Sequence, residues 1–475
     1  MDSPLGLSLD DRALALAVDG RVLSVAPSIV RREGENVIGV PAAGLLRSRP
    51  AEVSARHWSD IAGERATSAA ARSLAAAEVR ARLRAAGAGA DGAGADGEGA
   101  DGEGAGYSGA WIAASAVYTP RALSEILAVM EAASLPVRGF VDAAVATVAP
   151  LGLAKPAIVL EMGLSHVAAT AVECGPVVRR RRSLVSGGGG LLDIYQSWLD
   201  VVSAAMVLRT RFDPLHDAAV EQRLFDDLPA LAAQAAELGA ATVALEGPTG
   251  ERHEVAIARD QLAAAAAPRY RELERCLHEL RRAGAPVAVV VPAALLGLAG
   301  LRERLETLSD CELIAVPEGW AAAVASQLPV DEAAGAHVRL LRRLAATATL
   351  PGGEAPRRER LGAGRREGLD PTHVLYAGRA LPLTPRGLTV GREGNGADIT
   401  VSAGAAGVSR RHCTLLRGAD GVVLVDHSRY GTWVNDERVA GRTLLAAGDQ
   451  VRLGEPRIEL ALISVGGGHA QASPD

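Results

Sequence analysis

Residues 391–435 have the sequence GREGNGADITVSAGAAGVSRRHCTLLRGADGVVLVDHSRYGTWVN, and this stretch decides the fold of the C-terminal part of the chain. Four landmarks follow one another in and just beyond it: GR (391–392), SRRH (409–412), DHSRYGTWVN (426–435) and LAAGDQVRLG (445–454). Short apolar runs with strand character lie between the landmarks, broken by Gly and Asp turns such as the one at 419–421. Many short strands separated by turns predict a β-sandwich.

The loops of such a sandwich predict a phosphate-binding site. Polar residues at strand ends collect on the loops at one end of the fold, so Arg392, Ser409, Arg410 and Arg429 are expected to converge although they are distant in sequence. A guanidinium group presents paired donors that match phosphate oxygens, and a serine hydroxyl adds a short charge-assisted hydrogen bond.

The order and spacing of the landmarks resemble the forkhead-associated (FHA) domain, a phosphothreonine-binding module, over residues 373–465. The resemblance implies that Arg392 and Ser409 grip the phosphate and that Arg410 flanks it. It implies structural roles for four further residues: Gly391, His412, Gly431 and Asn435. The expected partner is a threonine-phosphorylated protein, the substrate of a Ser/Thr kinase.

Two positions depart from the family pattern. Tyr430 stands where the family usually has an Asn that bonds the ligand peptide's backbone, and Arg429 stands where a small hydroxyl residue is common. A phenol lacks the paired donor and acceptor of an amide, whereas Arg429 adds a cation. Phosphate binding is therefore expected, and the preference for residues that flank the phosphothreonine stays open. The alternative is an FHA-like sandwich that no longer binds phosphate.

The first 330 residues predict an α/β domain. Residues 5–30 are expected to form two strands around the turn Asp19-Gly20. Further segments follow in this order: ENVIGVPAAG from 35, a helix, strand and Ala-rich helix at 116–152, a hairpin at 157–175, a Gly-rich helix start at 186–199, and a strand, loop and helices at 286–326. As a series they resemble the ATPase domain of DnaK-type chaperones, a member of the actin-like superfamily.

The side chains that would do chemistry in that family are missing. Ser8 and Asp10 stand where the first hairpin needs a carboxylate and a glycine, Ala43 replaces the catalytic lysine, and Pro292-Ala293 replaces a Gly-Gly pair. Phosphoryl transfer depends on positioned metal, cation and backbone donors, so losing several removes most of the rate. We expect a degenerate ATPase fold without catalytic residues, metal or cofactor.

A residual nucleotide site is the alternative, in which ATP and magnesium still bind. Glycines before a helix N-terminus leave backbone N–H groups free to face an anion. The residues concerned are Glu161, Gly163, Gly187, Gly188 and Gly189.

Two segments of biased composition interrupt the chain, and a third ends it. Residues 86–106 are expected to form a flexible Gly/Ala/Asp loop rather than calcium repeats, residues 331–372 a linker, and residues 466–475 a disordered tail. Thr347 and Thr349 in the linker are hypothetical internal ligands of the FHA-like domain. The run Arg179–Arg182 is interpreted as a charged strand that protects a sheet edge, in preference to a membrane or nucleic-acid patch.

Composition and net charge limit the classes of partner expected for this chain. The chain has 475 residues, 48% of them hydrophobic, and a net charge of −6, which argues against general nucleic-acid binding. Its four cysteines show no metal-ligand spacing, the N-terminus does not resemble a signal peptide, and the apolar run at 286–301 is too short to span a bilayer. We therefore expect a cytoplasmic phosphothreonine-reading adaptor. The competing hypotheses are an ATPase targeted by its FHA domain and a purely structural component.

Overall fold

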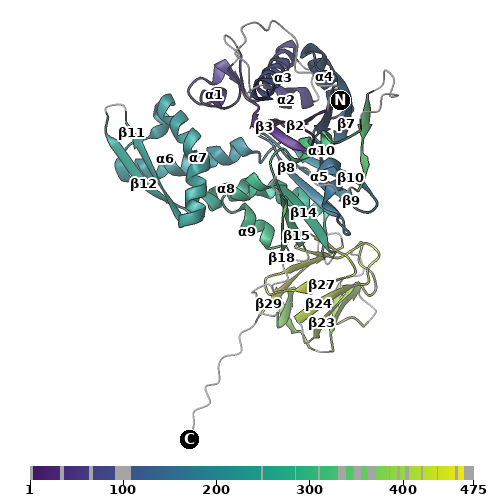
Figure 1. Ribbon diagram of the computed structural model, residues 1–475. Helices are drawn as coiled ribbons and strands as arrows, with labels where there is room; N and C mark the ends of the chain where they lie inside the picture. The colour runs from purple at the N-terminus through teal and green to yellow at the C-terminus, as the bar shows by residue number, and fades with distance from the viewer. Residues whose placement is uncertain are drawn as a thin grey trace, which may run out of the picture. The chain divides into compact units, whose positions relative to one another are not determined.

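The structure is a computed structural model, and it forms two compact units, described separately below (Figure 1). The N-terminal unit comprises Met1–Leu277, Ala288–Arg304 and Leu313–Glu359, and the C-terminal unit comprises His278–Val287, Leu305–Glu312 and Arg360–Asp475. The structure describes residues 4–32, 37–63, 68–90, 109–247, 250–283, 285–308, 311–329, 338–346, 355–361, 371–384, 386–392, 396–401, 406–418, 421–435, 437–454 and 458–464.

The first sheet of the N-terminal unit has the strand order β16-β7-β6-β1-β2-β3. Its strands are β1 (Leu5–Leu9), β2 (Ala13–Val18), β3 (Arg21–Pro27), β6 (Ala110–Ala114), β7 (Val137–Asp142) and β16 (Arg339–Leu341). β1–β2 and β2–β3 are antiparallel, whereas β6 runs parallel to both β1 and β7. Residues 5–30 thus contain three strands instead of the two expected, because the polar run Asp10–Arg12 makes a turn of its own.

The second sheet has the strand order β17-β10-β9-β8-β14-β15-β18. From β10 to β18 it corresponds to the first sheet taken from β3 to β16, and β17 is an additional strand. Its strands are β8 (Ala157–Met162), β9 (Val167–Glu173), β10 (Val177–Ser186), β14 (Val287–Pro292), β15 (Cys311–Val316), β17 (Arg343–Ala345) and β18 (Arg357–Leu361). β8–β9 and β9–β10 are antiparallel and β8–β14 is parallel, as for β1–β2, β2–β3 and β1–β6. The N-terminal unit therefore contains two sheets that share one strand pattern.

Two short helices with buried side chains follow the matching strands β7 and β15: α5 (Ala143–Val148) and α10 (Trp320–Ala325). Asp142 caps α5, since its carboxylate accepts the N–H of Val145 at 3.2 Å. α10 lies so close to β1 that a Cβ on Gly6 would come within 2.0 Å of the Ala322 carbonyl oxygen. Only glycine at position 6 allows this helix to pack against the sheet.

The unit has these further helices: α1 (Val40–Ala43), α2 (His57–Ala62), α3 (Ala69–Ala90), α4 (Pro120–Ala132), α6 (Leu191–Thr210), α7 (Ala218–Leu238), α8 (Arg259–Leu280) and α9 (Leu301–Glu306). The hairpin of β11 (Ala240–Glu246) and β12 (Arg252–Ala258) lies beside α6 and α7, and β4 (Val30–Arg31) pairs with β5 (Val53–Ser54) (Figure 1). By length and composition α6 could cross a membrane. Its side chains Ile194, Trp198 and Met206 are buried in the N-terminal unit.

The C-terminal unit is a β-sandwich, as predicted. One sheet has the order β22-β21-β23-β24-β27, with strands β21 (Leu388–Arg392), β22 (Ile399–Val401), β23 (Cys413–Gly418), β24 (Gly421–Asp426) and β27 (Arg442–Leu445). The other has the order β13-β26-β25-β28-β29-β19-β20, with strands β13 (Arg282–Ala283), β19 (His373–Tyr376), β20 (Arg379–Pro382), β25 (Trp433–Val434), β26 (Glu437–Val439), β28 (Gln450–Leu453) and β29 (Ile458–Ile463). Alternate apolar residues of these strands fill one core.

A segment far upstream belongs to this sandwich unit, and the sequence did not indicate it. β13 runs parallel to β26 and extends its sheet. Beside it, the buried carboxylate of Glu437 accepts hydrogen bonds from Arg281 and from Nδ1 of His278, the latter at 2.7 Å. Burial alone would raise the pKa of Glu437, but the His278 hydrogen bond and the Arg281 charge hold it below its usual value. Residues 278–283 are therefore part of the folded C-terminal unit.

Two expectations about biased segments need correction. Residues 86–90 continue helix α3 instead of opening a flexible loop. The stretch 331–372, expected to be a linker, contributes β16, β17 and β18 to the sheets of the N-terminal unit. Thr347, Thr349, residues 91–106 and the tail 466–475 lie outside the described residues.

Candidate functional site

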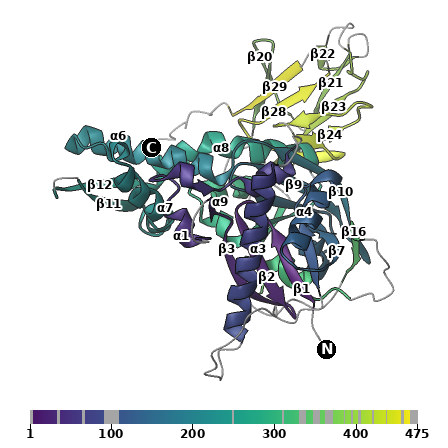
Figure 2. The same ribbon diagram turned by 90° about the horizontal axis from the view of Figure 1, so that it is seen from above.

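Three loops of the sandwich meet at the ends of β21, β23 and β24, which lie side by side (Figure 2). Arg392 is the last residue of β21, and its N–H donates to the Ser409 carbonyl at 3.2 Å. The Ser409 hydroxyl oxygen accepts the N–H of Arg429 at 3.2 Å. Because that oxygen accepts here, its own proton can be donated to a ligand. The structure thus brings together Arg392, Ser409 and Arg429.

Buried His412 ties two of these loops together. Its Nδ1 accepts the N–H of Ser409 at 3.1 Å, so Nε2 must carry the proton and donate it to the Gly431 carbonyl, also at 3.1 Å. Burial lowers the pKa of His412 below its usual value of 6.5. The ring is therefore neutral and joins the two loops by a hydrogen bond at each nitrogen.

This neutral histidine makes the stability of the sandwich pH-dependent. Below pH 6.5 the unfolded chain binds a proton at His412 and the folded chain does not, so stability present above that pH is lost as the pH falls. We expect a loss of about 1.4 kcal/mol per pH unit until the folded pKa is reached. Urea unfolding at pH 7 and pH 5.5 measures this loss of stability. The unfolded fraction is read by pulsed thiol labelling, in a common buffer, of Cys413, which is buried in the sandwich core.

A matched pair of variants isolates this effect from other titrating groups. His412→Gln should lose less stability than the wild type between the two pH values, whereas His427→Gln, at an exposed histidine of the same sandwich, should behave like the wild type. Equal pH dependence in the wild type and His412→Gln would contradict the assignment.

Backbone geometry explains two glycines of the site. A Cβ on Gly391 would lie 2.0 Å from the Arg410 carbonyl oxygen, so a larger residue would push the loops apart. Gly431 has a φ of 105°, which only glycine adopts readily. Asn435 joins neighbouring strands, since its side chain donates to Asp449 and accepts the N–H of Gln450.

Sequence reasoning missed the groups that hold the 426–432 loop in shape. The Asp426 carboxylate accepts the Ser428 N–H and the Thr432 hydroxyl, and the Ser428 hydroxyl accepts the Gly431 N–H. An aspartate two residues before a serine signals such a turn and could have been noticed. The loop is therefore fixed before any ligand binds.

Tyr430 and Arg410 are exposed beside this loop, Tyr430 with 64% of its surface accessible. Arg438, which the sequence did not single out, donates to the Tyr430 carbonyl at 3.3 Å, and its guanidinium stands 5.9 Å from the centre of the Trp433 ring. Because Arg438 reaches the loop from strand β26, only the folded sheet reveals this contact.

Comparison with known protein families identifies this part of the chain. A family model described as the FHA domain matches residues 388–454. These residues form an FHA domain. The match covers the three FHA loops and the strands that carry them. A search of characterised proteins found no match to the chain.

Outside the FHA domain, the structure uses the expected nucleotide-binding groups in other ways. Gly163 donates its N–H to the His166 carbonyl, Gly189 donates to Asp193, and Glu161 accepts the Ser115 hydroxyl. At the start of α6, the N–H groups of residues 191 and 192 donate to the carbonyls of residues 163 and 164. Gly187 and Gly188 have open space around them. Three N–H groups at this helix start, those of residues 189, 191 and 192, are therefore used within the protein.

A carboxylate of the chain itself occupies the turn between β8 and β9. Asp11 accepts the Leu164 N–H at 2.8 Å and the hydroxyls of Ser59 and Ser165 at 2.7 and 3.2 Å, and lies 3.3 Å from His166 Nδ1. Although burial opposes both charges, the pair lowers the pKa of Asp11 and raises that of His166 to about 9. An internal ion pair thus stands where an anionic ligand would need these donors.

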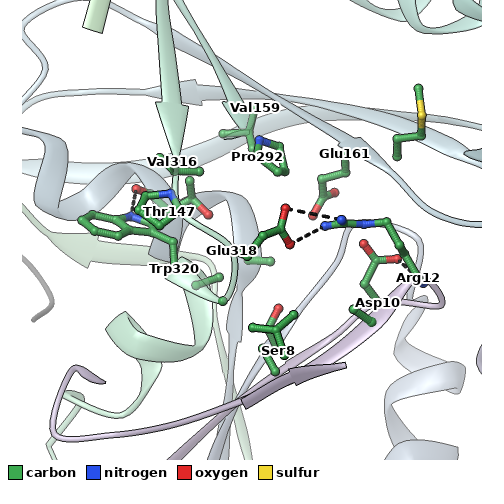
Figure 3. Close-up of a pocket in the computed structure, with 18 of the residues that line it drawn as sticks. Ser8, Asp10, Arg12, Thr147, Val159, Glu161, Pro292, Val316, Glu318 and Trp320 are labelled. Carbon is green, nitrogen blue, oxygen red and sulfur yellow. Dashed lines mark hydrogen bonds and ion pairs between the residues drawn. The ribbon is translucent and has the colours of Figure 1, made fainter. Parts of the chain in front are cut away.

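The adjoining pocket is rich in carboxyl groups. Figure 3 shows Asp10, Glu161 and the ion pair Arg12–Glu318 around it, and the Arg12–Glu318 contact measures 2.8 Å. Burial and the neighbouring Asp11 raise the pKa of Asp10 to about 7, and burial with Asp142 raises that of Glu161 to about 7. These raised pKa values mean that Asp10 and Glu161 take up protons close to neutral pH.

Asp10, Asp11 and His166 present ligand atoms within 4.8 Å of one another, a geometry that could hold a metal ion. His166 holds its proton to a pH of about 9 beside Asp11, so a metal ion would have to displace that proton to bind the imidazole.

Proposed function

We propose that this protein is a phosphothreonine-dependent protein-binding adaptor. The observation that carries the proposal is the convergence of Arg392, the Ser409 hydroxyl and Arg429 on pre-formed loops of an FHA domain. The guanidinium would take two phosphate oxygens and the hydroxyl a third, while Arg410 adds charge at the rim. The partner would be a protein phosphorylated by a Ser/Thr kinase.

Tyr430 and Arg429 would set the peptide preference of the site. The exposed phenol offers a stacking face and one hydrogen-bond group, and the Arg429 side chain is exposed next to it. Peptides with an acidic residue close to the phosphothreonine should therefore be preferred over peptides with a basic one.

The N-terminal unit would serve as a scaffold related to DnaK-type ATPases. The repeated strand order and the helices α5 and α10 support the relationship, and Ala43, the Asp11–His166 pair and the occupied donors of α6 support the loss of ATP chemistry. Isothermal titration with magnesium and ATP should give no binding in the micromolar range. ATP turnover would restore the alternative of an FHA-targeted ATPase.

Phosphopeptide binding to the full chain tests the adaptor function. Fluorescent phosphothreonine peptides with varied flanks should bind, and the same peptides without phosphate should not. Phosphate-independent binding, or no binding across a diverse library, would contradict the proposal and leave the purely structural role.

A further inference from the structure

Two arginine-rich runs that are far apart in sequence lie on adjacent strands of the N-terminal unit. β10 carries Arg179–Arg182, and β17 with the residue before it carries Arg342 and Arg343. The strands pair antiparallel, and the Arg180 N–H also donates to the Arg342 carbonyl at 3.2 Å. We call the exposed residues of these runs the arginine band: Arg179, Arg181, Arg182, Arg342 and Arg343.

A β-bulge makes this exposure possible. The register between β10 and β9 shifts between Arg180 and Arg182, so that Arg181 is an extra residue in the ladder. Without the bulge, strand alternation would turn Arg182 to the same face as Arg180, which points inward to Asp142 at 2.8 Å. With it, Arg182 faces the same side as Arg179, and Arg181 is exposed as well. Bulges that re-aim side chains in this way are frequent beside functional sites.

The band concentrates more positive charge than the fold itself requires. Arg179 and Arg343 are direct cross-strand partners, an arrangement of like charges that destabilises a sheet. The carboxylate of Glu173 binds both Arg179 and Arg181, at 2.6 and 2.7 Å. Among the described residues, no ion pair is found for Arg342 or Arg343. Protecting a sheet edge requires far less charge than this.

We propose that the arginine band binds an acidic or multiply phosphorylated stretch of the same polypeptide that the FHA domain recognises. The partner class rests on the proposed function, since a phosphorylated protein is an anionic one. In the described part of the chain β17 is the outermost strand of its sheet, so an extended peptide can lie along it. Neither run contains an aromatic residue for base stacking, and the net charge of −6 disfavours nucleic acid.

Three fluorescent peptides test this with the full chain. The first carries one phosphothreonine in neutral flanks. The second adds a tract of eight glutamates after a flexible linker of about 20 residues, which spans about 25 Å on average. The third equals the second without phosphate. The protein variants are Arg181→Glu/Arg343→Glu, Arg392→Ala, and Arg21→Glu as a control at an exposed arginine of the first sheet.

The glutamate tract should tighten binding of the phosphopeptide about ten-fold in the wild type and the control, as three or four exposed ion pairs would. The double variant should lose this gain and keep its affinity for the first peptide. Arg392→Ala should lose the first peptide and retain salt-sensitive binding of the third.

The two proposals fail separately. If the first peptide does not bind, the adaptor function is contradicted. Binding of the third peptide to the wild type and to the double variant then tests the arginine band by itself. Equal binding of the first two peptides, or an unchanged gain in the double variant, overturns the band proposal. The band proposal is also overturned if a single-stranded DNA oligonucleotide or phosphatidylserine vesicles bind more tightly than the third peptide and the double variant abolishes that binding.

Discussion

Replacing Arg392 by alanine should weaken phosphothreonine-peptide binding by at least about 100-fold, which corresponds to about 2.7 kcal/mol. The guanidinium would supply two charge-assisted hydrogen bonds to a dianionic phosphate from the end of β21, a position that Arg410 and Arg429 on the other two loops do not share. The contact between Arg392 and Ser409 uses backbone atoms, so the substitution leaves this contact in place. Fluorescence anisotropy with a phosphorylated and an unphosphorylated peptide measures the effect.

The matched control for this prediction is Arg417→Ala. Arg417 is an exposed arginine on β23 of the same domain and lies outside the three site loops. It should change affinity less than two-fold, as for removal of one distant surface charge. If Arg392→Ala bound the phosphopeptide as the wild type does, the site would have to be placed elsewhere on the FHA domain.

Replacing His412 by alanine should destabilise the FHA domain by about 3 kcal/mol. The change empties a fully buried position and leaves both the Ser409 N–H and the Gly431 carbonyl without their partner. Urea unfolding followed by pulsed labelling of Cys413 measures the loss of stability. Phosphopeptide affinity should fall as well, since the loops that carry Ser409 and Gly431 are no longer joined.

His427→Ala provides the comparison for that variant. His427 is exposed, and its side-chain contact is a hydrogen bond of 3.1 Å with the Thr414 hydroxyl. Its removal should cost less than about 1 kcal/mol. A similar cost for both variants would mean that His412 contributes only packing and does not join the two loops.

The polar groups of the two units are arranged differently. The FHA loops bring Arg392, the Ser409 hydroxyl and Arg429 together, whereas in the N-terminal unit Asp11 accepts hydrogen bonds from the donors of the β8–β9 turn. The buried Asp11 carboxylate needs partners within the protein, and Leu164, Ser59 and Ser165 supply them.

Sequence alone was sufficient for the FHA domain, and the physical reason is local. The Gly turns, the short strands and the order of Arg392, Ser409 and His412 specify one sandwich in which the loops must converge. The α/β character of the N-terminal unit was predictable in the same way, from alternating helical and strand periods.

Only the tertiary structure decided how charges pair across distant segments. The Asp11–His166 pair joins turns about 150 residues apart in sequence, Glu437 meets Arg281 and His278, and β17 comes to lie beside β10. Local periodicity carries no information about such pairings, because they depend on which strands become neighbours in a sheet. The sequence by itself therefore determined the FHA domain and the residues expected to bind phosphate, and the fold decided which charged groups pair with one another.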